Sequence, residues 1–166
     1  MHVPLDNFGE YSKSVCLAEA LKIKIEKPCS PYYGSLAGVI GKTKCRDVFE
    51  LIKIFEKAVG HRVSLYNYGK KEISDGKVAV LAGGGNYLDY LKDVFEEGVK
   101  TIITGISAKN SFSEKTHNYE EKQGINVLGG THYSTEKFAC QKICNYFQKI
   151  GLPSEFIEEE PLMEDL

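Results

Sequence analysis

The chain has 166 residues and a formal net charge of −2 at pH 7, so it is long enough for one domain with a real core. It has no block of Lys and Arg, and its aromatic residues do not alternate with basic ones, which argues against electrostatic binding of nucleic acid. The longest apolar runs, such as residues 78–82, are far too short to cross a bilayer. We therefore expect neither a membrane nor a nucleic acid as partner.

The cysteines indicate a reduced environment. There are five, an odd number, and none forms a Cys-x-x-Cys pair. Cys140 and Cys144 lie one helical turn apart, a poor arrangement for a framework disulfide. The N-terminus shows no basic segment followed by an apolar one, as a secretory signal would. We expect a cytoplasmic protein.

The first half of the chain contains two helical patterns and two short strand patterns. Apolar residues with a helical period predict helices over residues 11–22 and 44–59, and Gly60 ends the second as a C-terminal glycine should. The strand candidates are residues 36–40 and 62–66, followed by a polar connection at 70–77.

From residue 77 onward, strands and helices alternate. A continuous apolar run such as residues 78–82 is typical of a strand buried on both faces. Asn86, with Asp89 three residues later, resembles the start of a helix, and Gly98 ends it. The remaining predicted elements are strands at 99–104, 125–128 and 155–158 and helices at 114–123 and 134–150, with the acidic end from residue 159 fraying.

This alternation predicts an α/β fold with a mainly parallel or mixed sheet covered by helices on both faces. We expect one unit over residues 1–166, with an acidic tail at 159–166. In such sheets, ligands bind beyond the carboxyl ends of the strands. Three features fall at predicted strand ends: the triple glycine at 83–85, Thr104-Gly105 and Thr131-His132.

His132 and Glu136 stand four residues apart where an apolar run meets the last predicted helix. Such side chains share one helix face, about 5–6 Å apart at Cβ, which is close enough to share a metal ion. His2 and Asp6 repeat the spacing, so folding could bring four potential ligands together. Imidazole and carboxylate groups suit Zn²⁺, Mn²⁺ or Fe²⁺. The structural alternatives are a solvated first helical turn for the later pair and a cap or turn residue at Asp6.

Gly83, Gly84 and Gly85 could let backbone N–H groups approach an anion at a helix N-terminus. The segment matches neither a P-loop nor the dinucleotide fingerprint, because the required Lys-Ser/Thr and the third-glycine spacing are absent. The alternative is a tight turn between strand and helix.

The other histidines and the cysteines carry weaker signals. His61 begins a predicted strand without an acidic or Cys partner at ligand spacing, so we expect a structural or surface role. His117 follows Thr104-Gly105 and could lie over the sheet edge, although a structural role is the favoured alternative. Free cysteines are usually small buried apolar residues, and we expect this of cysteines 16, 29 and 45.

Four segments, in order, resemble the GTP cyclohydrolase 1 type 2 family, whose members are also called NGG-interacting-factor-three-like dinuclear-metal proteins. The segments are His-Val-Pro-Leu-Asp at 2–6, Val-Ala-Val-Leu-Ala-Gly-Gly-Gly at 78–85, Thr-Ile-Ile-Thr-Gly at 101–105 and Gly-Thr-His-Tyr-Ser-Thr-Glu at 130–136. The resemblance covers essentially the whole chain, and the last segment is its most specific element.

The resemblance implies a hexameric ring of α/β domains that holds up to two divalent metal ions in a cleft. It implies Asp6, His132 and Glu136 as metal ligands, with His2 as a neighbouring group or an additional ligand. The family's adjacent His-His pair lies upstream of the His-x-x-x-Asp segment, and these 166 residues contain no adjacent histidines. The chain therefore resembles the C-terminal portion of a family member, and we do not expect it to form a complete two-metal site alone.

Three functions are compatible with this resemblance. The first is a metal-dependent hydrolase of the GTP cyclohydrolase kind, in which a metal-activated water attacks a ring carbon of a purine nucleotide and Gly83, Gly84 and Gly85 seat its phosphates. Asp6 and Glu136 would hold or bridge the metals, and His132 would complete one coordination shell. The second is a non-catalytic metal-binding or partner-binding scaffold, and the third is an inactive remnant that keeps the ligands without metal.

Overall fold

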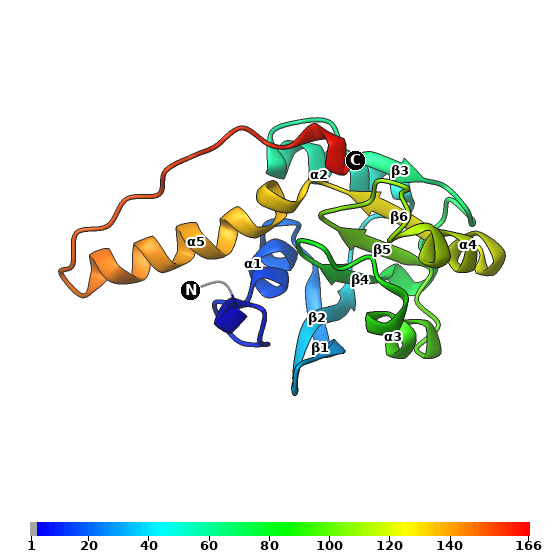
Figure 1. The fold of residues 1–166 in the computed structure, drawn as a ribbon, viewed down its shortest axis with the longest axis horizontal. Helices are drawn as coiled ribbons and strands as arrows, with labels where there is room; N and C mark the ends of the chain where they lie inside the picture. The colour runs from blue at the N-terminus through cyan, green and yellow to red at the C-terminus, as the bar shows by residue number, and fades with distance from the viewer. Residues whose placement is uncertain (1–2) are drawn as a thin grey trace.

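A computed structural model describes residues 3–166 and contains a six-stranded mixed sheet (Figure 1). The three central strands β4, β5 and β6 run parallel, while the other neighbours pair antiparallel. The predicted α/β class with a parallel or mixed sheet is confirmed. In spatial order the strands are β1 (Lys24–Tyr32), β2 (Ser35–Lys42), β4 (Lys77–Leu81), β5 (Thr101–Thr104), β6 (Asn126–Gly129) and β3 (Ser64–Tyr66).

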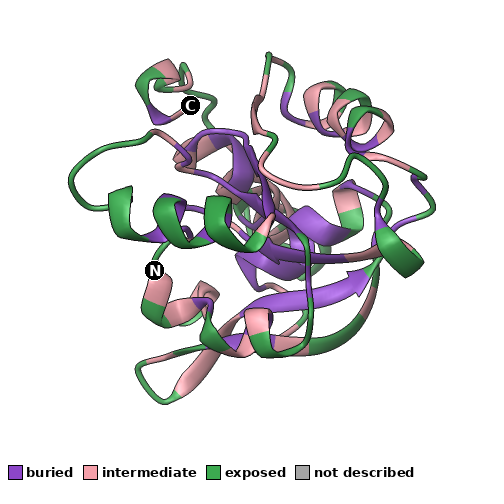
Figure 2. Cartoon of the chain, turned by 90° about the vertical axis from the view of Figure 1, so that its right-hand side faces the viewer, coloured by how far each residue is buried: buried purple, intermediate pink, exposed green. Residues whose placement is uncertain are grey.

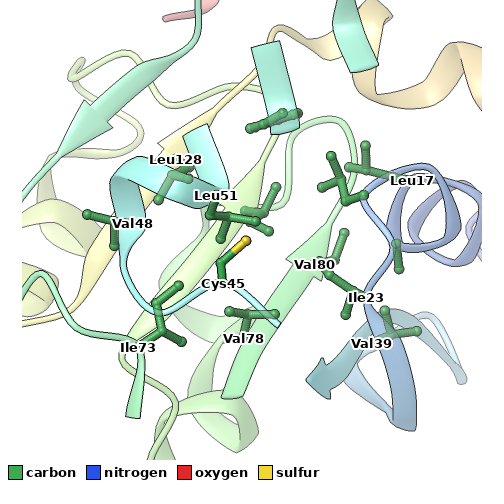
Figure 3. Close-up of a cluster of buried hydrophobic side chains, with 14 of the residues drawn as sticks. Leu17, Ile23, Val39, Cys45, Val48, Leu51, Ile73, Val78, Val80 and Leu128 are labelled. Atoms are coloured by element: carbon green, nitrogen blue, oxygen red, sulfur yellow. The ribbon is translucent and has the colours of Figure 1, made fainter. Parts of the chain in front are cut away.

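Helices cover both faces of the sheet, as the alternation along β4 shows. Val78 and Val80 belong to a buried cluster with side chains of α1 and α2, drawn in Figure 3. Ala79 and Leu81 point the other way and belong to a second cluster with Val94 of α3. The helices are α1 (Lys13–Ala20), α2 (Val48–Val59), α3 (Lys92–Glu96), α4 (Glu114–Gln123) and α5 (His132–Lys149).

Helix α2 begins and ends at residues suited to those positions. Asp47 caps its start, because Oδ1 accepts hydrogen bonds from the backbone N–H groups of Phe49 and Glu50, both at 2.9 Å. Gly60 ends it with a φ of 89°, the left-handed conformation that glycine adopts readily. The prediction of a helix ended by Gly60 is confirmed, with a start a few residues later than expected.

Strand β1 was not predicted, because its sequence is polar and contains Pro28 and Pro31. Prolines are confined to edge strands, and β1 lies at the edge of the sheet, paired only with β2 among the described strands. The turn between these strands places Tyr33 and Gly34 at φ values of 44° and 80°, as tight hairpin turns require.

The helix predicted from Asn86 is wrong over its first part. Residues Leu88–Tyr90 form a 3-10 turn, and α3 begins only at Lys92. Asn86 is not a cap; its side chain is buried, and its Nδ2 lies 3.5 Å from Nε2 of His117. A tertiary contact therefore replaces the local capping pattern.

Helix α5 projects from the body of the molecule, and the chain returns from its far end along an extended segment (Figure 1). On the outer turns of α5, Asn145, Tyr146, Gln148 and Lys149 are exposed. Figure 2 shows buried strands in the middle of the molecule. The strand predicted at 155–158 is wrong, since this part of the described chain has no regular secondary structure. The prediction that the chain frays after residue 159 is also wrong for residues Met163–Asp165. They form a 3-10 turn that contacts the start of α5 through Asp165.

Within residues 3–166, every helix falls short of the length or the apolarity that a membrane crossing requires.

Candidate functional site

His132 and Glu136 lie on the first turns of α5, just beyond the carboxyl end of β6. Nε2 of His132 is 3.0 Å from Oε1 of Glu136, so the four-residue spacing brings the pair onto one helix face as predicted. Gly130 makes the connection possible, because a Cβ at this position would overlap the ring of Phe55 on α2. The helix start is thus pressed directly against the core.

Thr131 holds a strained backbone immediately before His132. Its φ of 62° and ψ of 153° fall in a region occupied almost only by glycine. Two hydrogen bonds hold it there: Oγ1 accepts from Ser134 N at 3.2 Å, and the carbonyl accepts from Thr135 Oγ1 at 2.9 Å. These contacts fix where α5 starts and therefore where His132 points.

Two substitutions at Thr131 should separate the effect of its cap hydrogen bond on stability from the effect of its strained backbone. Thr131→Ala loses the cap bond but keeps a Cβ on strained backbone, so we expect the free energy of unfolding to fall by about 1–2 kcal/mol. Thr131→Gly loses the same bond and relieves the strain, so its loss should be smaller despite glycine's greater chain flexibility. Equilibrium urea unfolding of both variants measures this, and a larger loss for glycine would contradict the role of strain.

Asp165 ties the C-terminal turn to the same helix end. Its Oδ2 accepts a 2.8 Å hydrogen bond from His132 N, and its carbonyl accepts from Ser107 N at 2.7 Å and Ala108 N at 2.9 Å. A carboxylate is stabilised at a helix N-terminus by the helix dipole. Asp165 was not predicted, because no local pattern links an acidic tail to a helix 33 residues earlier.

Asp6 and Lys13 bring the other end of the chain to this pair. Asp6 follows the short 3-10 turn Val3–Leu5, and Lys13 opens α1, which packs against α5. The Lys13 ammonium lies 2.6 Å from Oδ1 of Asp6 and 3.1 Å from Oε1 of Glu136. Lys13 was not predicted, and it joins the two predicted carboxylates. His2 lies outside the described residues.

A pocket of about 280 Å³ opens beside these side chains. Asp6, His132 and Glu136 line it, and so do Gly84 and Gly85. Its remaining walls are Ser30, Tyr32, Ala37, Leu81, Ala82 and Tyr90. The predicted ligands and the glycine turn therefore share one pocket at the carboxyl end of β4.

Gly83 fits closely under the site. A Cβ at Gly83 would overlap Oε1 of Glu136 and lie 2.9 Å from Nε2 of His132. Its N–H donates to Thr135 Oγ1 at 3.0 Å, and its carbonyl accepts from Gly105 N and Ile106 N. Gly83 thus joins the ends of β4 and β5 to α5, whereas Gly84 and Gly85 face the pocket.

The electrostatic environment favours opposite charges on the His132–Glu136 pair. The hydrogen bond that His132 donates to Glu136 raises the pKa of His132, and burial opposes this only in part. Burial by itself would raise the pKa of Glu136, but the hydrogen bond with His132 and the charges of His132 and Lys13 together lower it. The site therefore keeps Glu136 as an anion.

Within residues 3–166, no three His, Cys, Asp or Glu side chains form a preformed metal-ligand group. The contacts explain why: His132 and Glu136 touch directly, while Asp6 reaches Glu136 through Lys13. The donors are nevertheless chemically suited to a cation, since the two carboxylates already converge on the Lys13 ammonium.

A second polar cluster lies in the interior around His117. Nε2 of His117 donates to the Ser107 carbonyl at 2.9 Å, and Nδ1 lies 3.2 Å from the Tyr68 hydroxyl and 3.4 Å from Oε2 of Glu120. Burial lowers the pKa of His117 and raises that of Glu120 to about 8. The structural alternative for His117 is the one observed; the sequence offered the i,i+3 spacing to Glu120 but no sign of its burial.

The remaining candidates have structural contacts. Nε2 of His61 lies 2.7 Å from Ser134 Oγ on α5, away from the pocket. Cysteines 16, 29 and 45 are buried, as expected. Burial raises the pKa of Cys16 to about 11 and that of Cys29 to about 12, which makes both thiols unreactive at neutral pH.

The model of the Duf34/NIF3 (NGG1p interacting factor 3) family matches residues 1–161. The chain belongs to this family. Two relatives named GTP cyclohydrolase 1 type 2 homolog, from Borreliella burgdorferi and Pseudomonas aeruginosa, are 26% and 24% identical to it. Each match covers 89% of this chain and 55% of the relative, so the chain spans about half the length of these relatives.

Solved structures support the same fold. The protein ybgI, described as of unknown function, has a TM-score of 0.81 at 22% identity over 97% of this chain and 61% of its own. Reduced HcgD from Methanocaldococcus jannaschii has a TM-score of 0.72 at 25% identity over 92% of this chain and 57% of its own.

Proposed function

We propose that this Duf34/NIF3 chain binds a divalent metal ion, Zn²⁺, Mn²⁺ or Fe²⁺, through Asp6, His132 and Glu136. The observation that carries the proposal is the convergence of groups from both ends of the chain at one pocket: Asp6 and Glu136 contact the same ammonium, and His132 contacts Glu136. His2 is a neighbouring group or an additional ligand. In the family, up to two ions are expected.

The residues present fit such an ion chemically. Carboxylate oxygens and an imidazole nitrogen are ligands that these metals accept. Gly83 leaves space in front of Glu136 and His132 that any side chain would fill. Asp165 and Thr131 hold the start of the helix that carries both groups, so their positions are set before a ligand arrives.

We propose metal-dependent hydrolysis of a purine nucleotide such as GTP as the activity of this site. The bound metal would supply a Lewis acid that makes water a nucleophile near neutral pH. Tyr32 and Tyr90, whose ring centroids are 5.3 Å apart, offer aromatic surface to a planar base. Gly84 and Gly85 allow a phosphate to approach the backbone closely. The names of the two GTP cyclohydrolase 1 type 2 homologs support this choice.

Metal binding by the purified chain tests the proposal. We expect about one equivalent of Mn²⁺ to bind in isothermal titration calorimetry and His132→Ala to weaken binding at least about tenfold. His61→Ala is the matched control, because His61 lies outside the pocket, and should bind as the wild type does. Equal Mn²⁺ binding by His132→Ala and the wild type would contradict the proposed ligand set.

A non-catalytic metal-binding or partner-binding scaffold is the alternative. Exposed apolar side chains on and after the projecting α5 favour it, among them Tyr146, Ile150 and Leu152. They also support self-association, for which the family resemblance implies a hexameric ring; light scattering distinguishes this from a monomer.

A nucleotide that binds the folded state must raise the melting temperature. A shift with Mn²⁺ but none on adding GTP would favour the scaffold.

A further inference from the structure

Lys13 is the most deeply buried charge at the site. Its side chain is 5% exposed, although lysine is almost never buried without a partner. Its ammonium contacts Asp6 at 2.6 Å and Glu136 at 3.1 Å. The two carboxylates therefore already hold one cation, which the chain itself supplies.

The oxygens that hold Lys13 are the ones that a metal ion would need. Oε1 of Glu136 contacts both the ammonium and Nε2 of His132, and Oδ1 of Asp6 contacts the ammonium. A divalent ion at these atoms would also stand next to a positive charge, and like charges repel strongly where water is largely excluded. The Lys13 ammonium and a metal ion therefore compete for the same ligands.

We propose that Lys13 is an internal competitor for the metal site: the metal binds only when the ammonium leaves Asp6 and Glu136, and its affinity is lowered accordingly. The lysine stem is flexible enough for this exchange, since four carbons separate the ammonium from the backbone. The inference rests on the proposed metal-binding function. It assigns Lys13 a regulatory role, because whatever draws the ammonium away raises the metal affinity.

Replacing Lys13 with a neutral side chain of similar length provides the test. We expect Lys13→Met to bind Mn²⁺ at least about tenfold more tightly than the wild type in calorimetry. Without metal, this variant should melt at a lower temperature, because Asp6 and Glu136 lose the ammonium that both contact. Mn²⁺ should raise its melting temperature more than that of the wild type. Lys13→Gln, which keeps hydrogen-bond donors near both carboxylates, provides a second neutral variant if Lys13→Met folds poorly.

Lys142→Met is the matched control. Lys142 also joins α5 to α1, through a 3.0 Å contact with Oε2 of Glu19, but lies outside the pocket. Its loss should leave the Mn²⁺ affinity unchanged. In Lys13→Met/Glu136→Gln, the gained affinity should disappear, which shows that the metal uses the released carboxylate.

The outcomes separate the two proposals. If the wild type and the neutral Lys13 variants bind Mn²⁺ equally, the metal site stands and the competition is wrong. Weaker binding by the variants would also overturn it. If neither form binds Mn²⁺, the metal-binding function fails, and the competition fails with it. If only the variants bind, the competition is established and the wild type is held in a metal-free state by Lys13.

Discussion

Gly83→Ala is expected to weaken Mn²⁺ binding at least about tenfold, as loss of a well-placed contact at a metal site does. The added Cβ would overlap Oε1 of Glu136 and crowd Nε2 of His132, so both side chains must turn away from their present positions. Asp6 would then lack Glu136 and His132 as the groups with which it is proposed to hold the metal ion. Calorimetry with Mn²⁺ measures the effect without depending on a substrate.

The same substitution should also cost stability. Gly83 has a φ of 72°, a conformation that costs a residue with a Cβ about 1–2 kcal/mol. Its N–H and carbonyl bind Thr135, Gly105 and Ile106, so the loop cannot shift without losing these bonds. Urea unfolding should therefore show a moderate loss in a protein that still folds, so that the lost metal affinity cannot be attributed to unfolding.

Gly84→Ala, at the residue next to Gly83, is the matched control. Its φ is not in the left-handed region, and the nearest atom to an added Cβ is Cδ1 of Ile106 at 3.9 Å, an ordinary contact. Stability and Mn²⁺ affinity should stay at wild-type values, although Gly84 also lines the pocket. If Gly83→Ala and Gly84→Ala had the same Mn²⁺ affinity, the close contact of Gly83 with Glu136 and His132 would not be what holds these ligands in place.

The parts of the site that follow from local spacing could be predicted. His132 and Glu136 are one helical turn apart, and their contact needs only that the helix starts where the apolar run of β6 ends. The sheet between residues 77 and 129 was likewise predictable, because buried parallel strands are continuous apolar runs. The repeated four-residue spacing from His2 made Asp6 a candidate, and the family resemblance implied that it belongs to the same site.

The parts that depend on tertiary contacts could not be predicted. Lys13 looks like an ordinary charged residue at the start of a helix, and only the packing of α1 on α5 buries its ammonium. Asp165 looks like part of a solvated tail until it meets the start of α5. Asn86 has the local pattern of a helix cap, yet burial beside His117 overrides that pattern. In each case the partner is far away in the sequence.

Glu120→Gln is expected to make the protein more stable than the wild type at alkaline pH. Glu120 is fully buried next to His117, and burial raises its pKa to about 8 from an ordinary value of 4.5. Between these values the folded state keeps a proton that the unfolded state releases, so the free energy of unfolding falls as the pH rises. Glutamine cannot ionise and escapes this loss.

The effect of Glu120 on stability is separated most clearly from that of His117 between pH 6.5 and 8. Below about pH 6.5, buried His117 gives the opposite slope: burial lowers its pKa, so the folded state resists a proton that the unfolded state accepts. The pKa of His132 is raised in the folded state, so its contribution to the free energy of unfolding also falls above pH 6.5. His132 is present in both proteins, and this contribution cancels in the difference between them. The difference across this window therefore reports Glu120 alone.

Urea unfolding of both proteins at a series of pH values measures that difference. One pKa unit corresponds to about 1.4 kcal/mol, so Glu120→Gln should gain about 2 kcal/mol on the wild type from pH 6.5 to pH 8. A constant difference across the window would mean that Glu120 is ionised in the folded protein and that another group balances its charge. A growing difference would show that the cluster beside the β5–α4 loop holds a protonated carboxyl at neutral pH, which can donate to His117 Nδ1 and so leave Nε2 as the donor to Ser107.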